Sequence, residues 1–167
     1  MKHLTTVDSP VGPLTLVADD GALAGIYMVE QRHRPQLDLQ RDDAILPAVR
    51  EQLEAYFRRE RKEFDVPLAL TGTPFQRAVW AGLQQIPYGE TWSYGRLAAH
   101  LGKPGAGRAV GLANGKNPCG IVVPCHRVVG STGSLTGYGG GLERKQWLLD
   151  LERGGPCASS SRAHAHG

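Results

Sequence analysis

Three side chains that could do chemistry together are adjacent in the second half of the chain: Cys125, His126 and Arg127. A thiolate is the nucleophilic form of cysteine, and neighbouring cations favour it. The apolar run Ile121–Val123 precedes these residues and is typical of a short buried strand. Pro124 fixes a backbone torsion and lacks an N–H donor, so it ends such a strand. The pattern therefore indicates a cysteine nucleophile at the end of a stiff element.

Other interpretations of Cys125 stay open on the residues alone. A lone cysteine after valines is usually a small buried apolar side chain, although a core position rarely adjoins two polar groups that are costly to bury. Adjacent residues of an extended chain point to opposite faces. His126 can therefore act as the base for Cys125 only across a bent backbone or a bridging water. A zinc site at Cys119, Cys125 and His126 would lack paired Cys-x-x-Cys spacing.

The segment Pro124–Val128, with the sequence PCHRV, resembles the active-site signature of the O6-alkylguanine-DNA alkyltransferases, or methylated-DNA–protein-cysteine methyltransferases. The resemblance extends from about Thr73 to Glu152, and a weaker likeness covers the N-terminal part. It implies a DNA repair protein that needs no cofactor and no metal. Such a protein flips an O6-alkylguanine, or an O4-alkylthymine, out of duplex DNA and transfers the alkyl group irreversibly to Cys125.

The resemblance also assigns roles to single residues. Glu152 would accept a hydrogen bond from His126, which acts on Cys125 through a water, as a chain of nucleophile, base and orienting group. Asn117 takes the position of a hinge between the DNA reader and the reactive segment, and a plain turn residue is the alternative. The residues that the resemblance places in the alkylguanine pocket are Cys125, Val128, Tyr138 and Gly139.

A DNA-reading unit is expected ahead of the reactive segment. Ser93 can cap a helix over 94–101, the break at 102–105 contains glycine, and a second helix is expected over 106–115. This is helix-turn-helix spacing. The second helix contains three glycines and is a poor helix former. Its expected use is close approach to another surface, either a neighbouring helix or a narrow DNA groove.

The resemblance gives Arg108 the part of an arginine that fills the gap left by a flipped nucleotide. It places Tyr94 beside that nucleotide, where it would push on the 3′ phosphate and donate a hydrogen bond to the guanine. A surface arginine and a half-buried tyrosine are the alternatives. The residues expected to contact DNA are Tyr94, Ala106, Gly107, Arg108, Ala109, Gly111 and Asn114.

The remaining pattern predicts an α+β fold. A small N-terminal α/β lobe over residues 1–70 combines an antiparallel sheet with a helix, and the resemblance makes it ribonuclease H-like. A mainly helical lobe over 71–154 contains the DNA-binding unit, of winged helix-turn-helix type. Residues 155–167 are interpreted as a disordered tail. The strands and the helix of the first lobe are expected at 3–7, 14–18, 23–28 and 44–59.

Five residues have no part in the expected chemistry. Lys145 is interpreted as an ordinary solvated lysine, although a lysine is typical of this position in the family. Trp92 is bulkier than the family pattern and could alter DNA contact. Cys119 replaces an aliphatic residue and would be a second oxidisable thiol. Arg32 and Arg34 are assigned to a solvated loop, and contact with a DNA backbone is the alternative.

The formal net charge of +3 over 167 residues permits a polyanionic partner without requiring one. Three cysteines without paired spacing argue against a disulfide framework. The first residues lack the apolar core of a signal peptide, and no stretch approaches about 18 apolar residues. We therefore expect a cytoplasmic monomer that binds double-stranded alkylated DNA and no membrane. Cooperative binding of several molecules to one DNA is left open.

Two functions of other classes compete with alkyl transfer. A lesion-binding protein of the alkyltransferase-like kind would lack the reactive cysteine, whereas Cys125 is present. A cysteine hydrolase that uses Cys125 and His126 would turn over on an ester or an amide. A hydrolase would not explain why the second helix, expected over 106–115, is rich in glycine.

Overall fold

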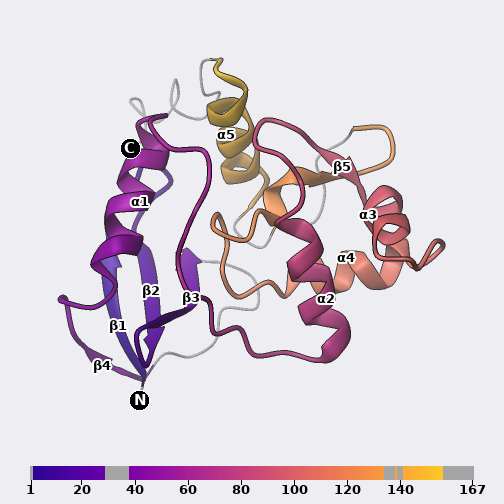
Figure 1. Cartoon of the computed structure of the whole chain (residues 1–167). Helices are drawn as coiled ribbons and strands as arrows, with labels where there is room; N and C mark the ends of the chain where they lie inside the picture. The colour runs from indigo at the N-terminus through magenta and orange to yellow at the C-terminus, as the bar shows by residue number, and fades with distance from the viewer. Residues whose placement is uncertain (1, 29–37, 134–137, 139–140, 156–167) are drawn as a thin grey trace.

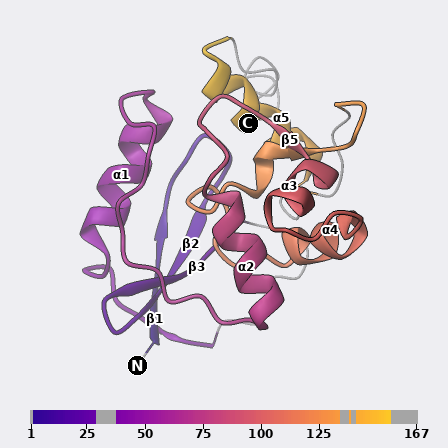
Figure 2. The same cartoon turned by 45° about the vertical axis from the view of Figure 1, so that its right-hand side comes forward.

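The computed structural model describes residues 2–28, 38–133, 138 and 141–155. They form two lobes that lie side by side, a sheet with one helix and a group of helices (Figures 1 and 2). The expected α+β fold is thus confirmed. The first lobe contains β1 (Lys2–Val7), β2 (Leu14–Asp19), β3 (Ala22–Met28), β4 (Gln40–Arg41) and α1 (Pro47–Phe57). The second contains α2 (Pro74–Leu83), β5 (Trp92–Ser93), α3 (Tyr94–His100), α4 (Gly107–Gly115), the 3₁₀ helix η1 (Cys125–Arg127), β6 (Val128–Val129) and α5 (Leu142–Arg153).

The sheet of the first lobe follows from the apolar residues of its strands. β2 pairs antiparallel with β1 and with β3, and the short β4 joins β1 in parallel. Leu14 and Leu16 of β2 are fully buried. The buried residues of α1, Val49, Leu53 and Tyr56, recur at helical spacing and belong to the same core. One face of α1 therefore points into the molecule, toward the second lobe as well as the sheet.

Local signals set where the helices begin. The Thr73 hydroxyl oxygen accepts from the backbone N–H of Gln76 over 3.1 Å, as part of the capping box that begins α2. The Ser93 hydroxyl caps α3 in the same manner. The helix expected over 44–59 is shorter, because Leu46 has a left-handed φ of 52° and Pro47 occupies the first helical turn.

α4 packs against both α2 and α3, which fixes the second helix of the helix-turn-helix unit. The indole N–H of Trp80 on α2 donates to the carbonyl of Ala113 on α4 over 2.9 Å, and both residues are buried. Gly102 and Gly105 in the intervening turn have positive φ angles of 74° and 89°. The turn therefore requires glycine at these positions.

The strand expected over Ile121–Val123 is wrong. The backbone N–H of Val122 donates to the Gly120 carbonyl over 2.9 Å, and Ile121 has a φ of 76°, so the segment is a tight turn. A short apolar run shows burial and cannot by itself distinguish a strand from a buried turn. A left-handed β-branched residue is strained by about 1–3 kcal/mol and persists only where its surroundings hold it.

The second lobe also contains a short parallel pair of strands. β5 pairs with β6, with Trp92 opposite Val128 and Ser93 opposite Val129. This pairing joins the start of α3 to the residues that directly follow η1. Along the described ranges, every helix is too short or too polar to cross a membrane.

Candidate active site

Cys125 is the first residue of η1 and is only 7% exposed. Its backbone N–H donates to the Val123 carbonyl over 2.8 Å, which bends the chain directly after Pro124. Burial raises the pKa of the Cys125 thiol above its usual value. Hydrogen bonding by the Asn117 side chain and the charge of Lys145 oppose this shift without cancelling it. The resting group is therefore a thiol, which needs a base before it can act as a nucleophile.

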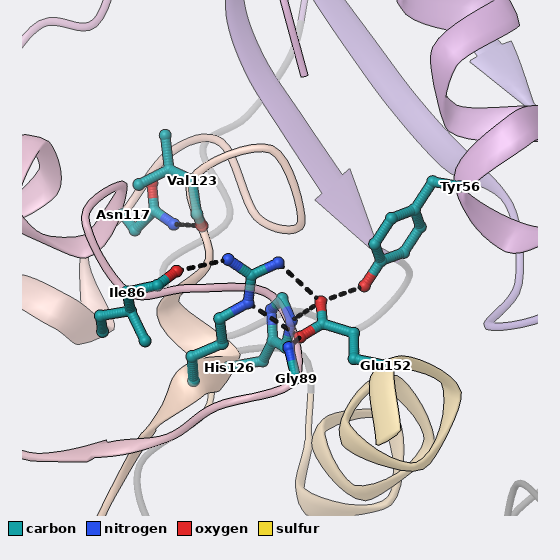
Figure 3. Close-up of polar contacts among 8 residues, drawn as sticks. Tyr56, Ile86, Gly89, Asn117, Val123, His126 and Glu152 are labelled. Carbon is teal, nitrogen blue, oxygen red and sulfur yellow. Dashed lines mark hydrogen bonds and ion pairs between the residues drawn. The ribbon is translucent and has the colours of Figure 1, made fainter. Parts of the chain in front are cut away.

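Glu152 on the last turn of α5 is the acceptor at the centre of the site (Figure 3). His126 Nε2 lies 2.6 Å from Glu152 Oε2. Arg127 donates from Nε to Oε1 over 2.8 Å and from Nη2 to Oε2 over 3.0 Å, a bidentate pair. Burial alone would raise the pKa of Glu152, but His126 and Arg127 hold it well below its usual range. The carboxylate is therefore ionised and accepts only.

This arrangement defines the state of His126. Because the Glu152 carboxylate can only accept, Nε2 must carry the imidazole proton that lies between them. Nδ1 is buried and has no hydrogen-bond partner among the described residues. Nδ1 thus lies outside the contact with Glu152, on the residue that directly follows the thiol in the chain. No direct hydrogen bond joins it to Cys125 in this part of the chain, so a proton could pass between them only through an intervening water.

Two further donors reach the Glu152 carboxylate from outside the reactive segment. The hydroxyl of Tyr56, on α1 of the first lobe, donates to Oε2 over 2.6 Å (Figure 3). The backbone N–H of Gly89 donates to Oε1 over 3.4 Å. Sequence reasoning missed Tyr56, because its spacing on α1 indicates only a core position. No local signal could have found it, since 96 residues separate it from Glu152.

Asn117 follows α4 and connects it to the reactive segment (Figure 3). Its Nδ2 donates to the Val123 carbonyl over 2.9 Å, and its Oδ1 accepts from the backbone N–H of Cys119 over 3.0 Å. Both hydrogen bonds are buried. They clamp the strained turn at Ile121 from both sides, which places Asn117 where the hinge was expected.

Lys145 on α5 is fully buried, so the expectation of a solvated lysine is wrong. Burial lowers the pKa of its ammonium to about 8, and the charge of Cys125 acts in the opposite direction. Its Nζ donates to the carbonyl of Val128, one of the expected pocket residues. The ammonium of Lys145 can be buried on this face of α5 because the Val128 carbonyl accepts its hydrogen bond and the Cys125 thiol lies nearby.

Tyr138 lies close to the thiol, and it is buried. Burial raises the pKa of its phenol well above the usual value, and the charge of Cys125 adds to the shift. Its hydroxyl has no hydrogen-bond partner within the described ranges. The structure thus brings together three of the four residues expected in the pocket. Gly139, the fourth, lies outside the described residues, as do Arg32, Arg34 and Cys157.

A groove of about 440 Å³ separates the start of α3 from α4. Tyr94 lines one side, and Gly107, Arg108 and Gly111 line the other. A Cβ added at Gly107 or Gly111 would lie 3.9 or 3.7 Å from Tyr94, an ordinary van der Waals distance, so a side chain there would narrow the groove without a clash at its Cβ. Arg108 is exposed, as is Ala109, and Ala106 is half-buried ahead of the helix. Six of the seven residues expected on the DNA-contacting face are therefore at least partly exposed, and the contact itself stays a prediction.

Asn114 does not belong to that face. It is 1% exposed and lies on the side of α4 that carries Val110 and Ala113, which pack into the lobe. Both polar atoms of its side chain lack a hydrogen-bond partner in the described part of the protein. The three glycines of α4 leave it without a clear apolar stripe, so its sequence does not show which side turns inward.

Trp92 and Cys119 are core residues. The Trp92 ring lies 5.0 Å from the His100 ring and 4.7 Å from the Arg96 guanidinium, so its bulk supports α3 from within. Cys119 is fully buried, and burial raises the pKa of its thiol far above the usual value. No group of three or more His, Cys, Asp or Glu that could hold a metal occurs within the described ranges.

Comparison with known proteins matches this geometry to one family. A family model described as "6-O-methylguanine DNA methyltransferase, ribonuclease-like domain" covers residues 2–70, and one described as "6-O-methylguanine DNA methyltransferase, DNA binding domain" covers residues 74–154. A methylated-DNA–protein-cysteine methyltransferase of Mycolicibacterium paratuberculosis is 59% identical over 92% of this chain and 93% of its own length.

Solved structures give the same result. A Mycobacterium tuberculosis protein named OGT, crystallised in complex with DNA, is 51% identical and superposes with a TM-score of 0.89 over 95% of this chain and 98% of its own. The O6-methylguanine-DNA methyltransferase of Pyrococcus kodakaraensis strain KOD1 is 27% identical, with a TM-score of 0.60 over 91% of this chain and 99% of its own.

Proposed function

The chain belongs to the 6-O-methylguanine DNA methyltransferase family, and from this premise we propose that Cys125 is its alkyl acceptor. The resemblance seen in Pro124–Val128 is confirmed. The chain repairs alkylated DNA by transferring the alkyl group to one of its own cysteines. One observation supports Cys125 in particular: it adjoins His126, whose Nδ1 is free while its Nε2 is held by Glu152. Cys119 has no such neighbour and is fully buried.

The geometry supports a stepwise transfer. His126 Nδ1 takes the thiol proton through a water, and the ionised Glu152 stabilises the imidazolium that forms. The charge of Lys145 favours the thiolate. Cys125 Sγ then attacks the alkyl carbon, the carbon–oxygen bond to the guanine breaks, and the base leaves with the electron pair and gains a proton. The thioether has no leaving group that water displaces readily, so each molecule reacts once.

The charge distribution supports duplex DNA as the partner. No acidic residue occurs between Glu90 and Glu143, whereas Arg96, Arg108 and Lys116 of this segment are exposed. Such a surface attracts phosphates without reading sequence. The outward side of α4 carries small residues, Gly107, Ala109 and Gly111, beside the exposed Arg108 and Leu112, and small residues let a backbone approach a narrow groove closely.

Within this surface, Arg108 and Tyr94 are proposed to act on the flipped nucleotide from opposite sides of the groove between α3 and α4. Arg108 would fill the gap in the stack, and Tyr94 would contact the 3′ phosphate. Action as a monomer in the cytoplasm, and on O4-alkylthymine, stays a prediction.

Intact-mass spectrometry after mixing with a duplex that carries one O6-methylguanine tests the proposal. We expect a gain of one methyl group and never more than one per molecule. The gain should be absent in Cys125→Ala and retained in Cys119→Ala. Methylation that persists in Cys125→Ala would contradict the assignment. Tight binding without a mass change would indicate a lesion-binding protein instead, and turnover on an ester would indicate a hydrolase.

A further inference from the structure

Tyr56 brings a group from the first lobe into direct contact with the reactive site. It lies on α1, is fully buried, and donates its hydroxyl to Glu152 Oε2 over 2.6 Å (Figure 3). His126 Nε2 lies 2.6 Å from the same oxygen atom. With Arg127 Nη2 at 3.0 Å, three donors thus share this oxygen, and only Tyr56 comes from the first lobe. The mechanism above uses only one of them.

We propose that Tyr56 is a positioning residue that sets how strongly His126 acts as a base, through the Glu152 oxygen that both residues share. A hydrogen bond to a carboxylate oxygen withdraws part of its negative charge. The Tyr56 hydroxyl therefore leaves less of that charge to stabilise the His126 imidazolium. His126 then remains neutral, and able to accept the thiol proton, down to a lower pH. This inference deepens the proposed function and rests on it.

The surroundings hold the Tyr56 hydroxyl in place and protonated. The Tyr56 ring contacts the rings of Phe57, Phe64 and Tyr88, with centroids at 5.3, 5.4 and 6.2 Å. Burial raises the pKa of Tyr56 well above its usual value, and the neighbouring Glu152 adds to the shift. The hydroxyl is consequently protonated, and able to donate to Glu152, around neutral pH.

Other charged and titratable groups face the same carboxylate. Titration of these groups would not produce the shift in pH profile expected for Tyr56. Arg127 stays charged at all accessible pH values, and burial raises the pKa of Tyr88 and of Tyr138. Cys125 and Lys145 titrate within the site and are common to every variant compared. The groups that surround Glu152 are Tyr56 from α1, Tyr88 from the loop before β5, His126 and Arg127 from η1, and Tyr138 ahead of α5.

The test is the pH profile of single-turnover methyl transfer in Tyr56→Phe. Removing the hydroxyl keeps the ring and frees charge on Glu152 Oε2, so the acid limb of the profile should move to higher pH by about 0.5–1 unit. Tyr88→Phe is the matched control, because it removes a nearby hydroxyl for which the structure records no bond to Glu152. A profile that is unmoved in Tyr56→Phe would overturn the inference, even if the protein became less stable.

A second measurement does not depend on activity. The protonation midpoint of the His126 ring, followed by nitrogen NMR without DNA, should rise in Tyr56→Phe and fall when 3-fluorotyrosine replaces Tyr56. Fluorine withdraws electrons from the ring and makes the hydroxyl a stronger donor. If Tyr56→Phe fails to fold, the fluorinated variant decides alone, and an unchanged or raised midpoint refutes the inference. If the wild type transfers no alkyl group, the proposed function fails while the NMR titration still decides the role of Tyr56.

Discussion

The ammonium of Lys145 donates to the backbone carbonyl of Val128, and both residues are completely shielded from solvent. The contact joins α5 to β6 and places a cation beside Cys125, whose charge acts on that of Lys145. β6 pairs in turn with β5, directly ahead of Tyr94. Through the β5–β6 pair, this hydrogen bond thus connects the surroundings of the thiol to Tyr94, which lines the groove between α3 and α4.

The buried ammonium of Lys145 predicts a pH-dependent stability. Its pKa of about 8 in the folded protein lies below the ordinary 10.5, so between these pH values the unfolded chain binds more protons. Stability should therefore rise with pH across this window, by on the order of 3 kcal/mol relative to Lys145→Met. Urea unfolding at a series of pH values measures the difference. Both proteins should carry Cys125→Ala, which removes the coupled thiol, and parallel pH profiles would contradict the prediction.

Replacement of Asn117 by alanine should uncouple the turn from α4. Two buried hydrogen bonds are lost, and the unpaired Val123 carbonyl and Cys119 N–H together cost about 2–4 kcal/mol of unfolding free energy. The thiol should also react more slowly with iodoacetamide at neutral pH, because hydrogen bonding by Asn117 favours the thiolate. Denaturant unfolding and the alkylation rate check the two effects. A destabilised protein with an unchanged thiol rate would assign Asn117 a structural role only.

Asn114, which lies on α4 itself, offers the opposite case to Asn117. Its buried amide has no partner among the described residues, so Asn114→Leu should leave the free energy of unfolding unchanged or raise it by about 1 kcal/mol. Because the side chain points inward, affinity for undamaged duplex DNA should not change. Titration of a labelled duplex checks this, and a clear loss of affinity would restore Asn114 to the DNA face.

Arg108 should matter most where a base must leave an intact stack. Flipping costs a few kcal/mol in duplex DNA and little in a single strand, so Arg108→Ala should slow transfer from duplex by about 10–100-fold and from single-stranded substrate much less. Rapid-quench kinetics on both substrates measure the ratio. Arg77→Ala, which removes an exposed charge from α2, controls for the loss of a cation. Equal slowing on both substrates would indicate a phosphate contact instead.

Features that depend on neighbouring residues could be predicted from the sequence. The Thr73–Gln76 capping box, the glycine turn between α3 and α4, and the adjacency of Cys125 and His126 are all written within a few positions. So are the exposed Arg108 and the small residues of α4. These are enough to recognise the family and to propose Cys125 as its reactive cysteine, because each follows from local backbone preference or from the chemistry of adjacent side chains.

Tertiary packing decided the rest. Whether Ile121 lies in a strand or a strained turn depends on the Asn117 clamp. Whether Lys145 and Asn114 face water depends on which side of α5 and α4 turns inward. Tyr56 reaches Glu152 across 96 residues, and only the packing of the two lobes brings them together. The sequence determines which chemical groups the side chains supply. Burial and contacts between distant residues determine how those groups are charged and which partners they bind.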